Sequence, residues 1–359
     1  MNQWAALACT VFIGVAIGLL FSKLKVPAGY MIGAFVGVTA FNVITSLAWA
    51  PPNTRTAVQV IAGAFVGCSM ERSDVARLKH IGQPVLFMLA SFLIFNIVLG
   101  FVLWAISSLD LVTALMCAVP GGINDTPIVA ADMGANAPVV TVMQLIRQIL
   151  GIALFPSMIL AFDRYRTAQG HPDIRSKGAI ASTDKRKKSK QKSWISIIVT
   201  LFVAALAGIL GKMTGIPGMT FAFAIVAVLV LKLALDFAFI PKWVKLACQL
   251  IAGCYLGTLL TMQGLTDMKM LIVPIIVLIF GYTLNCFVMG KLESRFFGYG
   301  RKEGMLIASP AGASDMALII DDMKVKNTDV VIMQVIRAVV VMTLFPQIIN
   351  LICFAMGGT

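Results

Sequence analysis

The feature that most constrains this chain is a series of apolar segments, most of which approach the roughly 20 residues needed to cross a lipid bilayer. Hydrophobic residues fill 59% of the 359 positions, charged residues fill only 13%, and the mean hydropathy is +0.92. A soluble chain of this size could not hide so much apolar surface from water. The sequence therefore predicts an all-α polytopic membrane protein. It argues against a soluble enzyme, a secreted disulfide scaffold and a DNA-binding domain.

The chain repeats itself with an offset of 190 residues and without a gap. The offset aligns Trp4 with Trp194, Pro27 with Pro217, Gly67 with Gly257, Pro120 with Pro310 and Arg147 with Arg337. An apolar composition alone would match some leucines and valines, but it would not match proline, glycine and arginine in one register. A duplicated unit is therefore predicted.

Each half holds four plain apolar segments, a segment interrupted by proline and glycine, and a long final helix. The plain segments are 3–21, 27–44, 56–70 and 84–107 in the first half, and 194–210, 217–239, 244–262 and 271–290 in the second. The final helices are predicted near 137–159 and 328–355. We predict a first membrane repeat over 1–162, a basic cytoplasmic linker over 163–193 and a second membrane repeat over 194–359.

The distribution of positive charge helps to decide how the interrupted segments lie. The linker carries ten Lys or Arg against three Asp, and basic residues gather in cytoplasmic loops of membrane proteins. If each interrupted segment is a re-entrant hairpin, the other loops hold twelve basic residues inside and five outside. If it crosses the membrane, the count is eight inside and nine outside. The charges favour two inverted repeats of five transmembrane helices, each with a re-entrant hairpin broken by Pro and Gly; interrupted crossing helices are the alternative.

The polar residues at membrane depth gather at the two breaks. Proline removes a backbone donor and glycine permits unusual dihedral angles, so the helix must break there and expose amide and carbonyl groups. Broken backbone at this depth survives where protein or a water-filled cavity satisfies it, and matched breaks in two halves point to a transporter binding site. The predicted substrate or ion site comprises Pro120, Gly121, Gly122, Asn124, Asp125, Pro310, Gly312, Ser314 and Asp315.

The final helices add Gln144 with Arg147 and Gln334 with Arg337, each pair on one face of an apolar helix. An arginine near the bilayer centre is costly and needs a partner. Asp125 and Asp315 are the nearest candidates by position. Two interpretations stay open: the arginines brace the core through ion pairs with these aspartates, or at least one receives a substrate carboxylate. We assign all four final-helix residues to the predicted site.

The cysteines and histidines do not suggest metal or redox chemistry. Seven cysteines fall in or beside apolar segments, and the two histidines, His80 and His171, lie in charged stretches without metal-ligand spacing. We therefore predict no enzyme activity, no catalytic residue, no metal site and no cofactor, although coupling to H⁺ or Na⁺ is compatible with the pattern.

At these motifs the chain resembles the AbrB-type membrane-protein family, whose unit is duplicated. The resemblance rests on Pro120-Gly-Gly122, on Pro310-Ala-Gly312 and on the Gln-x-x-Arg and Phe-Pro positions that follow. Members of this family have been labelled as ammonia monooxygenases or as regulators of gene expression. The break followed by a long helix is more distantly similar to bile-acid and glutamate symporters and cation/proton antiporters. That similarity implies a scaffold, a mobile core and alternating access.

The leading hypothesis is a secondary-active transporter of a small solute, an organic anion among the options, coupled to H⁺ or Na⁺. A monovalent cation/proton antiporter and a membrane-bound regulator of gene expression without transport are the alternatives. The expected location is the bacterial inner membrane, where the partners are the lipid bilayer and a small molecule or ion. The net charge of +13 reports topology in this interpretation rather than nucleic-acid binding. The oligomeric state stays open, with a homodimer among the options.

Overall fold

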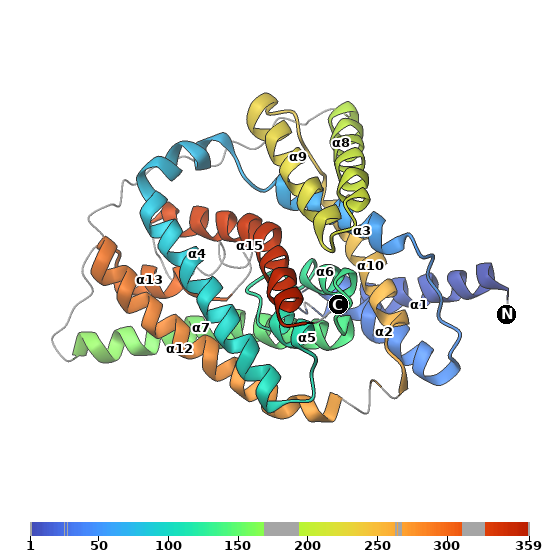
Figure 1. The fold of residues 1–359 in the computed structure, drawn as a ribbon, viewed down its shortest axis with the longest axis horizontal. Coiled ribbons are helices and arrows are strands. Elements are labelled where there is room, and N and C mark those ends of the chain that lie inside the picture. Colours follow the sequence, from blue (N-terminus) through green and yellow to red (C-terminus); the bar gives the residue numbers. More distant parts are fainter. Residues whose placement is uncertain are drawn as a thin grey trace.

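The computed structural model describes residues 2–24, 26, 28–168, 194–262, 264, 268–310 and 327–357, and all regular structure in these residues is helical (Figure 1). The first half forms α1 (Gln3–Lys23), α2 (Gly29–Thr45), α3 (Thr54–Gly67), α4 (Arg72–Ile106), α5 (Leu111–Cys117), α6 (Thr126–Asp132) and α7 (Ala137–Ala168). The second half forms α8 (Trp194–Met213), α9 (Met219–Leu235), α10 (Lys242–Thr258), the 3-10 turn η1 (Met268–Leu271), α12 (Ile272–Phe297), α13 (Arg301–Ile307) and α15 (Thr328–Ala355). Most of the predicted linker, residues 169–193, lies outside the described residues.

Six of the described helices are long and apolar enough to cross a bilayer: α1, α4, α7, α8, α12 and α15. The 17-residue helices α2 and α9 are apolar but shorter. Large apolar side chains such as Trp4, Phe12, Phe202 and Phe280 are exposed on these helices. A folded soluble protein would bury such side chains, whereas lipid covers them in a membrane. The helices therefore indicate a multi-pass membrane protein.

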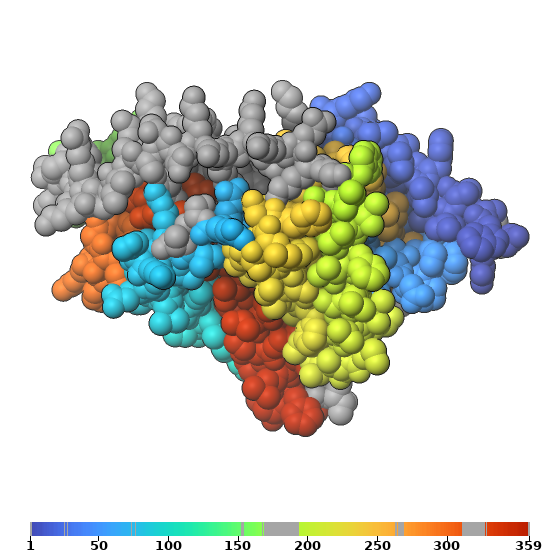
Figure 2. All heavy atoms as spheres, turned by 90° about the horizontal axis from the view of Figure 1, so that it is seen from above, coloured from blue at the N-terminus to red at the C-terminus, as the bar shows by residue number. Residues whose placement is uncertain are grey.

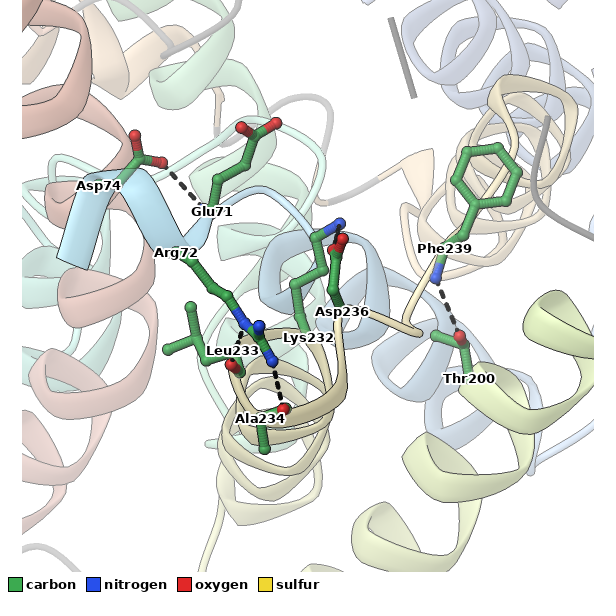
Figure 3. A network of polar contacts seen from close by, with 9 residues as sticks. All are labelled: Glu71, Arg72, Asp74, Thr200, Lys232, Leu233, Ala234, Asp236 and Phe239. Carbon is green, nitrogen blue, oxygen red and sulfur yellow. Dashed lines mark hydrogen bonds and ion pairs between the residues drawn. The ribbon is translucent and has the colours of Figure 1, made fainter. Parts of the chain in front are cut away.

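The fourth helix begins earlier than the sequence predicted. We expected it to start near Pro84, but α4 starts at Arg72 and Pro84 lies inside it. The backbone N–H of Glu71 donates to Asp74 Oδ2 at 2.9 Å, which is one half of a capping box that fixes the helix start (Figure 3). The apolar pattern marks only the part of a helix that lipid or protein covers, so it missed this polar first turn.

The offset of 190 residues recurs in the local geometry. The backbone N–H of Trp49 donates to Thr10 Oγ1 at 3.1 Å, and 190 residues later Phe239 donates to Thr200 Oγ1 at 3.0 Å (Figure 3). Ser46 and Asp236, the C-caps of α2 and α9, both have the left-handed backbone conformation. The two halves of the sequence therefore build the same helix pairs.

The described helices form two groups. Group A comprises α1, α2, α3, α8, α9 and α10, and group B comprises α4, α5, α6, α7, α12, α13 and α15 (Figure 1). Helices α6, α7 and α15 of group B contact group A, and Figure 2 shows α15 at the surface between α4 and α9. Each group contains helices from both halves, so the two repeats are interleaved rather than separate.

Group A is held together by packing between helices that belong to different repeats. Helix α2 packs against α10 of the other half, and α9 packs against α3. The helices approach closely because small residues line the contact: a Cβ on Gly253 would lie 2.2 Å from the Met31 carbonyl oxygen, and one on Gly63 would lie 3.0 Å from the Phe221 carbonyl oxygen. These two contacts are related by the same 190-residue offset.

Candidate functional site

The first break lies between α5 and α6 and turns the chain back on itself. Helix α5 ends at Cys117, residues 118–125 are not part of either helix, and α6 begins at Thr126. After α6, the backbone N–H of Asn136 donates to Thr113 Oγ1 at 2.8 Å. The segment therefore ends beside the first turn of α5, where it started.

The carbonyl groups left open at this break are satisfied by the final helix of the same repeat. Gln144 Nε2 on α7 donates to the carbonyl oxygens of Met116 at 3.2 Å and Val119 at 3.1 Å. Its Oε1 accepts a hydrogen bond of 2.9 Å from Arg147 Nε. A helix end leaves its last four carbonyl groups without intrahelical donors, and a buried acceptor without a partner costs about 1–3 kcal/mol. The polar side chain of Gln144 can be fully buried because its amide group is paired with these carbonyl groups.

Arg147 connects the two breaks to each other. Its Nη2 donates to the carbonyl oxygen of Gly121 in the first break, and its Nη1 donates to that of Pro310 in the second at 2.8 Å. The guanidinium also lies 5.8 Å from the ring centroid of Tyr282 on α12. A planar group with five donors can serve several carbonyl oxygens at once, which a lysine could not do in the same geometry.

The second repeat reuses this arrangement. Gln334 Nε2 on α15 donates to the carbonyl oxygens of Leu306 at 2.8 Å and Ile307 at 3.0 Å, and Arg337 Nη1 donates to that of Ser309 at 2.6 Å. Arg337 lies 5.2 Å from the ring centroid of Phe92, which matches Tyr282 through the repeat. Each arginine therefore packs against the fourth helix of the opposite repeat. Gly312, Ser314 and Asp315 of the predicted site lie outside the described residues.

The predicted ion pair between Arg147 and Asp125 is wrong. Within the described residues, Asp125 forms no ion pair with either Arg147 or Arg337. Both Nη atoms of Arg147 and Nη1 of Arg337 instead donate to backbone carbonyl oxygens. The physical reason is that each break leaves buried carbonyl oxygens without intrahelical donors. These oxygens lie closer to the guanidinium groups than the Asp125 carboxylate does, and they take the hydrogen bonds. The matching expectation for Asp315 falls outside the described residues.

The two glycines of the first break permit close approaches that a larger residue would prevent. A Cβ on Gly121 would lie 2.2 Å from Thr126 Oγ1 and 2.7 Å from Met342 Sδ. A Cβ on Gly122 would lie 2.9 Å from Asp125 Oδ2. The break is therefore packed on the α6 side and on the α15 side.

A cavity of about 270 Å³ lies where the first break meets α3 and α10. The sequence-predicted residues Pro120, Gly121, Gly122, Asn124, Asp125 and Arg337 line it; Gln144, Arg147, Pro310 and Gln334 are not among its lining residues. Its other walls come from α3, α10, α7 and α15. This volume is at the small end of ligand sites, so it suits a small solute.

The lining of the cavity is polar in a way that favours a ligand with hydrogen-bonding groups. Among its described lining residues are two cations, Lys245 and Arg337, and one carboxylate, Asp125. Asn124 Oδ1 is buried and makes no hydrogen bond to any of the described residues. A buried acceptor of this kind is normally paired, so it marks a place where a ligand or water donor fits.

Several polar residues of this region were not among the predicted site residues, and three of them are informative. Lys245 and Gln249 line the cavity from α10, and Tyr282 on α12 donates to the Ala118 carbonyl oxygen at 2.9 Å. Gln249 carried a usable signal because it matches Gln59 in the repeat. Lys245 lies at the start of the predicted segment 244–262, where a basic residue is typical of a segment end, and Tyr282 gave no pattern that separates it from an ordinary buried aromatic residue.

Polar contacts hold the end of α6 against group A. Arg55 on α3 forms an ion pair of 3.1 Å with Asp132 and donates to the Ala131 carbonyl oxygen at 3.0 Å. Asp132 Oδ2 also accepts from the backbone N–H of Gly218 at 2.6 Å, directly before α9. The Asp132 carboxylate therefore joins α6 to α3 and to the start of α9.

The family model described as transition state regulatory protein AbrB matches residues 30–353 of this chain. The chain belongs to the AbrB family. Among AbrB relatives, YhjN, an uncharacterized protein of Bacillus subtilis (strain 168), is 24% identical over 95% of this chain and 92% of its own length. A protein of Escherichia coli (strain K12) that bears the provisional name of regulator AbrB is 23% identical over 98% of this chain and 96% of its own length.

Proposed function

We propose that this AbrB-family chain is a secondary-active transporter of a small organic anion, working by alternating access in the bacterial inner membrane. The observation that carries the proposal is the cavity at the first break. It places Arg337, Lys245 and the unpaired Asn124 Oδ1 beside broken backbone at the boundary of groups A and B. Broken helices that line a cavity between two helix groups are the usual construction of a transporter site.

The topology that we propose is two inverted repeats of five transmembrane helices, each with a re-entrant hairpin. The hydrogen bond from Asn136 to Thr113 supports a hairpin, because it joins the two ends of the first interrupted segment. Polar contacts also join residues that this topology places on the same side of the membrane. Arg301 and Lys302 pair with Asp163 on the proposed cytoplasmic side, and Lys212 donates to Thr56 on the proposed outer side.

The arrangement of the contacts supports an inward-facing state. The cavity lining includes Ala28, Ser69 and Lys245, which lie at helix ends on the proposed cytoplasmic side. On the proposed outer side, Arg55 and Asp132 join α3 to α6. Alternating access then requires group B to move relative to group A so that this outer contact opens.

Uptake into proteoliposomes tests the proposal. Purified protein is reconstituted, and entry of short-chain carboxylates is measured under an imposed pH gradient and, separately, an imposed Na⁺ gradient. We expect gradient-driven uptake of at least one carboxylate, with collapse of the coupling gradient. A correctly folded protein that moves none of the carboxylates under either gradient would contradict the proposal.

A cation/proton antiporter is the second candidate, and Asp125 in the cavity is the observation that favours it. In that case, adding Na⁺ or K⁺ to acid-loaded proteoliposomes releases protons, and Asp125→Asn abolishes the release. An organic anion transporter without cation exchange gives no proton release on cation addition at any pH.

A regulatory role without transport rests on names: the description of the family model and the name of the Escherichia coli relative. Deleting residues 169–193 separates the two roles. A transporter keeps its uptake after the deletion, whereas a regulator that signals through this basic segment loses its effect on gene expression while no uptake is measured before or after.

A further inference from the structure

We propose that Lys245 is the cation that receives the carboxylate of the transported anion. This inference deepens the proposed function and rests on it. It concerns a residue at the start of the predicted segment 244–262, which the fold places on the wall of the cavity, in the first turn of α10.

The position of the ammonium group supports this role. Lys245 is half-buried, and its Nζ lies 4.2 Å from the ring centroid of Phe65, another residue of the cavity wall. This cation–π contact engages the face of the ring and no oxygen acceptor, so N–H donors of the ammonium group stay available to a ligand. Within the described part of the chain, Nζ forms neither a hydrogen bond nor an ion pair. A ligand carboxylate in the cavity would therefore find donors that are already desolvated on one side.

The other cations near the cavity are used by the protein itself. Arg147 donates to the carbonyl oxygens of Gly121 and Pro310, and Arg337 donates to that of Ser309. Moving either guanidinium onto a ligand would leave buried carbonyl groups without donors. Lys245 could bind a ligand at no such cost, because its ammonium group serves no backbone acceptor.

The other repeat offers a direct comparison for this position. The residue that matches Lys245 is Arg55 at the start of α3, and Arg55 is paired with Asp132. The same position therefore holds a cation that makes a protein contact in one repeat and a cation that faces a cavity in the other. Of the two, the lysine is the one placed to contact a solute.

The cavity also indicates what kind of anion fits. Its apolar wall comes from Ile61, Phe65 and Val66, and its volume is small. Asn124 Oδ1 offers an unused acceptor, and the Asp125 carboxylate disfavours a second negative charge close to it. The chemistry suits a small monocarboxylate with a short apolar body and a hydrogen-bond donor.

The test compares Lys245→Gln with Lys242→Gln. Lys242 is exposed three residues earlier on the same helix, so the control removes an equal charge from the same end of α10. Binding is measured as the ligand-induced rise in melting temperature of detergent-purified protein, with short-chain monocarboxylates and, as neutral probes, the amides of the same acids. Uptake into proteoliposomes gives KM and the maximal rate.

We expect Lys245→Gln to raise KM for the carboxylate by about tenfold or more with a smaller change in maximal rate, since a hydrogen bond to a charged group is lost. Lys242→Gln should leave KM unchanged, Lys245→Arg should recover part of the loss, and the amides should not stabilise any variant. Lys245→Gln with wild-type KM and wild-type stabilisation overturns this inference while the transport function stands. A folded wild-type protein that neither transports nor is stabilised by any of the carboxylates overturns both.

Discussion

Arg55 and Lys245 occupy the same position in the two repeats, yet they make different contacts. Arg55 pairs with Asp132 and holds α6 against group A, whereas Lys245 faces the cavity beside Phe65. The contrast teaches that duplication fixes where a charged residue lies on its helix, whereas the position of the facing element decides what it binds. If the two helix groups move as proposed, these two residues are where the exchange of contacts should be seen first.

Other matched positions have diverged in kind. Asn96 donates to the Leu115 carbonyl oxygen at 3.0 Å, and its counterpart Cys286 makes a weaker contact of 3.3 Å to that of Met305. Fully buried Leu103 corresponds to fully buried Glu293, whose two carboxylate oxygens have no hydrogen-bond partner in the part of the chain that the structure describes. Substitutions at these matched positions and at the breaks should therefore differ in their effect on stability and access.

Arg147→Met should have the largest effect because it removes the link between the two breaks. The substitution leaves the carbonyl oxygens of Gly121 and Pro310 and the Gln144 Oε1 without this donor, at about 1–3 kcal/mol for each buried acceptor. We expect little monodisperse protein after detergent extraction, measured by size-exclusion chromatography. Arg164→Met, an exposed position on the same helix, is the control. Recovery of Arg147→Met at wild-type yield would contradict the bracing role.

Gly121→Ala should destabilise the first break, although the second repeat carries alanine at the matching position 311. The new methyl group would overlap Thr126 Oγ1 and Met342 Sδ, and overpacking of this kind costs about 1–3 kcal/mol. The melting temperature should fall, and adding Thr126→Ala should restore part of it by removing one of the two obstacles.

Gly82→Ala is the matched control for this substitution. A Cβ on Gly82 meets no atom within 4 Å, and alanine favours a helix, so its melting temperature should stay level or rise slightly. If both alanine variants behave alike, the close packing at Gly121 does not limit stability.

Glu293→Leu should stabilise the protein, and the reciprocal Leu103→Glu should destabilise it. A buried carboxyl group without a hydrogen-bond partner is unfavourable by about 1–3 kcal/mol on mutational scales, and the first repeat already accepts leucine at this position. The melting temperatures of both variants check the prediction. A fall in melting temperature for Glu293→Leu would show that Glu293 has a stabilising partner or a role that the paired position lacks.

Arg55→Gln should change stability least, because a partly exposed ion pair contributes about 1 kcal/mol or less. Its effect should appear in accessibility. With the other six cysteines replaced by alanine, Cys248 in the cavity wall reports access through its reaction with a membrane-impermeant maleimide added from outside. We expect faster labelling in Arg55→Gln than in wild type.

Lys212→Gln controls for loss of positive charge on the same proposed face, and the charge exchange Arg55→Asp with Asp132→Arg should return the labelling rate toward that of wild type. Equal labelling of Cys248 in all four proteins would mean that the Arg55 contact does not close this side of the cavity.

Much of the fold could be predicted from the sequence, because a helix that crosses a membrane is marked by a long local run of apolar residues. Each of the ten apolar segments predicted as a span coincides with a described helix, and the interrupted segment of the first half is broken at Pro120-Gly121-Gly122 as predicted. Helix bounds were less certain: the polar start of α4 at Arg72 depends on a capping box that apolar periodicity does not see.

The sequence by itself determined that buried polar residues would gather at the breaks, because proline and glycine there leave backbone groups in need of donors. The sequence could not determine which side chains supply those donors. That Arg147 binds the carbonyl groups of both breaks rather than Asp125, and that Lys245 reaches the cavity while Arg55 pairs with Asp132, depend on contacts between residues far apart in the chain. Only the interleaving of the two repeats brings those residues together, and for that reason the tertiary structure decided the site.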